Sequence, residues 1–72
     1  MTTLKQIITD GSRGAVSLTD TIAAIEAMTG VSDSPTADLF VATVEQHWSN
    51  TSVFDRRALL KKFVIAEIAN AY

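Results

Sequence analysis

The chain has 72 residues, of which 47 % are hydrophobic, and its six basic and eight acidic side chains give a net charge of −2. This length fits one domain that covers residues 1–72. The absence of cysteine excludes disulfides and thiolate metal sites, and the single histidine, His47, cannot build a zinc site alone. We therefore expect no metal and no cofactor.

Nothing in the sequence predicts export or insertion into a membrane. The first residues contain no apolar run of signal-peptide length, and no segment approaches the roughly 18 apolar residues of a membrane span. We expect a cytoplasmic protein without membrane contact. A domain of this size buries only about 60 % of the surface that its unfolded chain exposes. The high apolar content therefore predicts that some apolar surface remains for a second chain.

Two helices are predicted in the first half of the chain. The first covers residues 4–9, begins after the capping residue Thr3 and ends at Asp10-Gly11. The second begins after Ser17, whose hydroxyl can accept from free backbone N–H groups. It ends at Gly30, because glycine adopts the left-handed conformation that terminates many helices.

Two further helices are predicted in the second half. Ser34 caps the third helix, Pro35 occupies its first position, where a missing N–H costs nothing, and Ser49-Asn50 closes it. The fourth follows Ser52 and covers residues 53–71, a length of about 28 Å. No strand pattern of period two competes anywhere. We predict an all-α fold, a small bundle of three to four helices with the long C-terminal helix as its spine.

The fourth helix carries apolar residues on two sides. At about 100° per residue, one side forms a complete core-facing surface. It comprises Val53, Phe54, Ala58, Leu60, Val64, Ile65, Ile68, Ala69, Ala71 and Tyr72. Leu59, Phe63 and Ala66 lie roughly opposite, where a helix at the edge of a bundle should be polar. Either the helix is central, with neighbours on both sides, or this second face meets another chain.

Charge is segregated along the chain. Five acids and no base lie in residues 14–54, whereas Arg56, Arg57, Lys61 and Lys62 follow in the fourth helix. The basic residues either form an ordinary solvated face or join the second apolar face in a patch suited to an acidic protein surface.

We predict a partner-binding surface on the fourth helix. It consists of Leu59, Phe63 and Ala66, with Arg56 and Lys62 at its rim. Arginine and aromatic residues are enriched in protein interfaces, and a surplus apolar face suits association between copies. The expected partner is another protein, with homo-oligomerisation.

Residues 24–31, followed by a polar turn and a capped helix, resemble a helix-turn-helix motif. The resemblance implies DNA binding through the second helix of the motif, residues 35–48. That helix carries Asp38 and Glu45 and no lysine or arginine. Because neutralisation of phosphates supplies most non-specific affinity for DNA, these charges disfavour a nucleic-acid partner. DNA binding remains an alternative.

Asp33-Ser34, at the start of an acidic helix with an apolar stripe, resembles the Asp-Ser-Leu motif of acyl carrier proteins. The resemblance implies that Ser34 would carry phosphopantetheine. Pro35 stands where the family has leucine, and helix capping accounts for Ser34 as well. A carrier-like domain is a second alternative.

Catalysis has little support in the sequence. There is no cysteine and no Gly-x-Ser-x-Gly motif, so no nucleophile is paired with a base. The three glycines are too scattered to form a phosphate-binding loop. We therefore predict a small non-enzymatic protein-interaction module, of the regulator or inhibitor type, that binds another protein and/or self-associates through its C-terminal helix.

Overall fold

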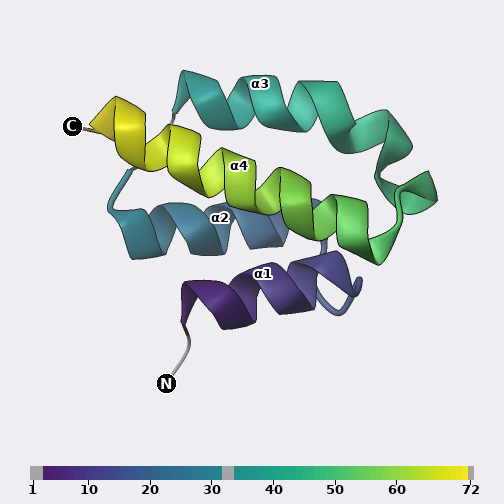
Figure 1. Cartoon of the computed structure of the whole chain (residues 1–72). Coiled ribbons are helices and arrows are strands. Elements are labelled where there is room, and N and C mark those ends of the chain that lie inside the picture. Colours follow the sequence, from purple (N-terminus) through teal and green to yellow (C-terminus); the bar gives the residue numbers. More distant parts are fainter. Residues whose placement is uncertain (1–2, 32–33, 72) are drawn as a thin grey trace.

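The computed structural model describes residues 3–31 and 34–71, with only the backbone described at 70 and 71. Its elements in chain order are α1 (Leu4–Ser12), α2 (Leu18–Thr29), α3 (Pro35–Val44), the 3₁₀-helix η1 (Glu45–Asn50) and α4 (Val53–Ala71). No strand occurs in these residues. The predicted all-α fold with a long C-terminal helix is confirmed (Figure 1).

Side chains cap all four α-helices as the sequence predicts. The hydroxyl oxygens of Thr3, Ser17, Ser34 and Ser52 each accept a hydrogen bond from a backbone N–H two or three residues later. Gly30 ends α2 with a φ of 77°, in the left-handed region that favours glycine. Short-range chemistry therefore sets where the helices begin.

The first helix is longer than predicted, because Gly11 lies inside it rather than after it. A Cβ at Gly11 would lie 2.6 Å from side-chain atoms of Thr21, so only glycine lets α1 approach α2 this closely. The helix continues to Ser12, whose hydroxyl donates to the Ile8 carbonyl at 2.6 Å. This glycine serves helix packing instead of helix termination.

The third helix is shorter than predicted. Its α-helical part ends at Val44, and the following six residues wind more tightly as η1. At the end of η1 the carbonyl of Trp48 accepts from the N–H of Thr51 at 3.2 Å and from Nε of Arg56 at 2.8 Å. The tighter winding of η1 thus coincides with a hydrogen bond from Arg56, in the first turn of α4, to the Trp48 carbonyl.

Helix α4 is the spine of the bundle. It contacts α1, α2 and α3, whereas α1 also packs against α2, and α2 packs against α3 (Figure 1). All four α-helices contribute to one core, which comprises Ile7, Ile8, Ile22, Ile25, Ala37, Leu60, Phe63 and Val64. No helix in the described part of the chain is long and apolar enough to cross a membrane.

The rotation of α4 about its axis differs from the prediction. Leu60, Phe63 and Val64 are buried, whereas Phe54 and Ile65, expected in the core, are 82 % and 68 % exposed. The buried side of α4 also includes a charged residue, Glu67, whose side chain is fully buried. A prediction that places every charged residue in solvent puts Glu67 outside and therefore assigns the wrong side of α4 to the core.

A polar contact fixes Glu67 within the core. The Ser34 hydroxyl donates to Oε1 of Glu67 at 2.5 Å and also accepts from the N–H groups of Thr36 and Ala37. One side chain thus caps α3 and binds the C-terminal third of α4. The other carboxylate oxygen, Oε2, is buried without a hydrogen-bond partner in the described residues.

Candidate protein-docking site

The structure places the centre of the predicted partner surface inside the protein. Phe63 is 2 % exposed, and its ring stacks on Phe40 with a centroid separation of 4.9 Å and an interplanar angle of 29°. The prediction that Phe63 lies at the centre of an exposed face is therefore wrong. On this side of α4, α3 packs against the helix and the Phe40 ring covers Phe63.

Arg56 also has an internal role. Its guanidinium donates from Nε to the Trp48 carbonyl at 2.8 Å and from Nη1 to the Ser12 carbonyl at 3.1 Å. The same group lies over the Trp48 ring, 5.5 Å from its centroid. Arg56 therefore joins the ends of α1 and η1 to the start of α4.

The other predicted residues meet α3 at a shallow apolar groove. Leu59, Lys62 and Ala66 line it together with the edge of Phe63, in a volume of about 300 Å³. Its α3 wall comprises Thr36, Leu39, Phe40, Thr43 and Val44. Leu39 is 70 % exposed beside it. The structure thus brings four of the five predicted residues together, with Lys62 as the only charged one.

A second surface of α4 lies in solvent, although the apolar pattern assigned all of its residues except Lys61 to the core. It comprises Phe54, Ala58, Lys61, Ile65, Ile68 and Ala69, all of them exposed, and is called here the outer face of α4. At about 100° per residue, these six positions fall within an arc of about 100° on one helix. Phe54 and Ile65 are the most exposed large apolar members. The signal that could have found this face is the i, i+4, i+7, i+11 spacing from Phe54 to Ile65.

Basic side chains flank the outer face on the side of α1. Lys5, Arg57 and Lys61 line a hollow of about 400 Å³ between α1 and α4, with Ile8 and Thr9 at its base. No acidic residue lines this hollow. Three of the six basic residues of the chain therefore gather at this seam.

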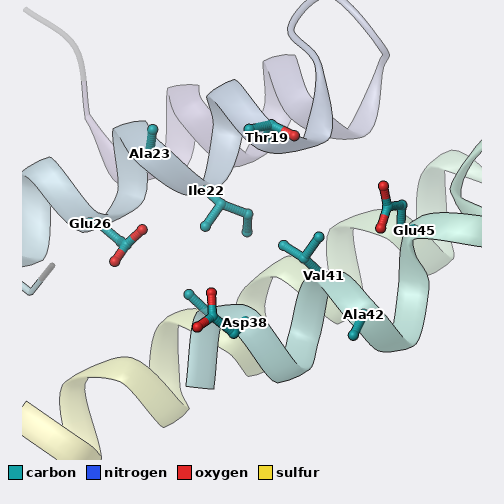
Figure 2. A pocket seen from close by; sticks show the side chains of 9 residues that line it. Thr19, Ile22, Ala23, Glu26, Asp38, Val41, Ala42 and Glu45 are labelled. Atoms are coloured by element: carbon teal, nitrogen blue, oxygen red, sulfur yellow. The ribbon is translucent and has the colours of Figure 1, made fainter. Parts of the chain in front are cut away.

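Acidic side chains gather at another seam, between α2 and α3. Figure 2 shows Glu26 and Asp38 projecting from the two helices toward a common groove, with Glu45 at one end. The groove has a volume of about 460 Å³, and no basic residue lines it. Its apolar lining comprises Ile22, Ala23, Ala37, Val41 and Ala42. One carboxylate oxygen of Glu26, Oε2, has no hydrogen-bond partner in the part of the chain that the structure describes.

The structural setting of Ser34 and His47 bears on chemical activity. Ser34 is 6 % exposed and its hydroxyl already binds Glu67, whereas attachment of phosphopantetheine needs an accessible hydroxyl. His47 is exposed on η1, and no group of three or more metal-binding side chains occurs within residues 3–31 and 34–69.

Comparison of the chain with protein-family models, curated proteins and solved structures finds no match. A proposal for the function therefore rests on the exposed surfaces and grooves described above.

Proposed function

We propose that the protein is a cytoplasmic, non-enzymatic protein-interaction module that docks on another protein, including further copies of itself, through the outer face of α4. The observation that carries this proposal is the exposure of Phe54 and Ile65, 82 % and 68 %, on one face of the same helix. An exposed surface that carries several large apolar side chains is typical of protein-binding sites.

The energetics of burial support a docking role of moderate strength. Complete burial of one large apolar side chain stabilises a complex by about 1.5–3 kcal/mol. Scaled by their exposed fractions of 82 %, 68 % and 42 %, Phe54, Ile65 and Ile68 together would contribute about 3–6 kcal/mol before the cost of association. Basic residues beside them, Lys61 and Arg57, add attraction to an acidic partner and faster encounter. These magnitudes fit a reversible interaction better than a permanent one.

The proposal is tested by site-specific photocrosslinking. A photoreactive phenylalanine analogue replaces Phe54 in one variant and Gln46, an exposed polar residue on η1, in the control. Both variants are irradiated in extract from the cells that make the protein. We expect discrete adducts of higher mass from position 54 and none of them from position 46. Equal adducts at both positions, or none from position 54, would overturn the proposal.

A further inference from the structure

The two seams that carry charge share no helix. The basic hollow with Lys5 and Lys61 lies between α1 and α4, and the acidic groove with Glu26 and Asp38 lies between α2 and α3. Because α1 packs on α2 and α4, and α3 packs on α4 and α2, the helices close a ring in which these seams are opposite. One molecule therefore presents complementary charges on opposite sides.

We propose that copies of this chain associate head to tail, with the outer face of α4 of one copy seated in the α2–α3 groove of the next. This inference rests on the proposed function, since it uses the same face of α4 and adds the identity of its partner. A second copy is the partner that we infer, because each chain carries both an apolar surface with basic residues and an apolar groove with acidic residues.

The apolar parts of the two surfaces match in kind. The outer face of α4 presents Phe54 and Ile65, and the groove offers an apolar floor around Ile22 and Val41 (Figure 2). Ala42 also lines the groove, and small residues allow a helix to approach closely. A helix that places one apolar face in a groove is a recurrent mode of recognition.

The charged parts match in sign. Lys61 lies within the outer face and Arg57 beside it, whereas Glu26 and Asp38 rim the groove without a basic neighbour in its lining. Docking would bring a cation beside the exposed carboxylate of Asp38 and the half-buried carboxylate of Glu26. Opposite charges at an interface steer encounter and fix the orientation of the partners.

The same charges disfavour a symmetric dimer through α4. A two-fold interface places one patch against its own copy, so Arg57, Lys61 and Lys62 would face one another. Like charges in this arrangement weaken association. A head-to-tail contact has no such conflict, and it leaves one free surface at each end of a pair.

Complementation between two blocked variants tests the inference. Ala42→Arg fills the groove and keeps α4 intact, whereas Ile65→Arg blocks the outer face and keeps the groove intact. Both residues are exposed, so unchanged far-UV circular dichroism is expected. Both changes add positive charge, so the two blocked surfaces cannot attract each other. Gln46→Arg, exposed and outside the groove lining, is the matched control.

The readout is solution mass by size-exclusion chromatography with light scattering at low salt. We expect the unmodified chain and Gln46→Arg to form oligomers that grow with concentration and dissociate as salt is added. Each blocked variant alone is expected to associate about a hundredfold more weakly. Their equimolar mixture should give a 1:1 heterodimer and nothing larger, because only one intact pair of surfaces remains.

Three results would overturn the inference. A monomeric unmodified chain at every concentration excludes association between copies, while photocrosslinks from position 54 to a different protein would leave the proposed function standing. Loss of assembly in Ile65→Arg but not in Ala42→Arg indicates a symmetric contact through α4. Co-sedimentation of the chain with anionic phospholipid vesicles, together with a mixture that stays monomeric, assigns the basic face to a membrane surface instead.

Discussion

Truncation of Phe63 and of Phe54 distinguishes the observed rotation of α4 from the one that the apolar pattern predicts. Both residues are phenylalanines on the same helix, but Phe63 is 2 % exposed and Phe54 is 82 % exposed. Replacing a buried phenylalanine by alanine costs about 3–5 kcal/mol, because apolar contacts are lost and a cavity remains. Phe63 also loses its stacking on Phe40. An exposed substitution away from special features changes stability by about 0.5 kcal/mol or less.

These magnitudes are large relative to the stability of a small domain. At about 0.05–0.15 kcal/mol per residue, 72 residues give a free energy of unfolding of about 4–11 kcal/mol. Phe63→Ala therefore removes most of the stability, and Phe63→Leu, expected to cost about 1–2 kcal/mol, keeps the chain folded for measurement. Phe54→Ala is the matched control.

Urea unfolding followed by far-UV circular dichroism measures these differences. Each variant is measured at two protein concentrations, because self-association makes apparent stability depend on concentration. We expect Phe63→Ala and Phe63→Leu to lower the unfolding midpoint and Phe54→Ala to leave it almost unchanged at the lower concentration. If Phe54→Ala is as destabilising as Phe63→Ala, the observed rotation of α4 is refuted.

Three further substitutions test contacts between helices. Ser34→Ala removes a helix cap and the donor to buried Glu67, so we expect a loss of about 2–4 kcal/mol in urea unfolding. Gly11→Ala, which would stabilise an unconstrained helix, should cost about 1–3 kcal/mol, because the new Cβ meets Thr21 at 2.6 Å. Arg56→Met loses two hydrogen bonds to carbonyls and should cost about 2–3 kcal/mol in thermal unfolding.

Each of these predictions has its own control. Ser52→Ala removes an exposed cap without a buried partner and should cost about 1 kcal/mol. If Ser34→Ala costs no more than Ser52→Ala, the hydrogen bond to Glu67 does not contribute to stability. If the close approach is the cause, Gly11→Ala should cost less in a Thr21→Ala background than in the unmodified chain. Lys62→Met, at an exposed position, should change stability by less than about 0.5 kcal/mol. If Arg56→Met costs no more than this, the hydrogen bonds from Arg56 to α1 and η1 do not stabilise the fold.

Helix boundaries were predictable where local chemistry decides them. A serine hydroxyl and the two or three N–H groups after it lie close in sequence, so Ser17, Ser34 and Ser52 marked the starts of three helices correctly. Gly30 marked the end of α2 because its left-handed conformation needs no distant partner. Gly11 failed as an end signal because its role depends on a residue of another helix.

The orientation of α4 was not predictable, because a long-range polar contact decides it. Glu67 reads as a solvent-facing residue in isolation, and only the hydroxyl of Ser34 makes its burial tolerable. With Glu67 placed outside, the best apolar side of the helix includes Phe54 and Ile65 and excludes Phe63. The centre of the predicted interface, Phe63, therefore lies in the core, although the expectation of surplus apolar surface on α4 agrees with the exposure of Phe54 and Ile65.

The bond between Ser34 and Glu67 has a consequence for the motions of the bundle. The first turn of a helix usually opens independently and at little free-energy cost, so its amide hydrogens exchange early with solvent. Opening the first turn of α3 would withdraw the hydroxyl from a carboxylate in the core, 33 residues further along the chain. The amino end of α3 and the C-terminal third of α4 should therefore open together, as one cooperative unit, and the amides of Thr36 and Ala37 should exchange as slowly as those of the core.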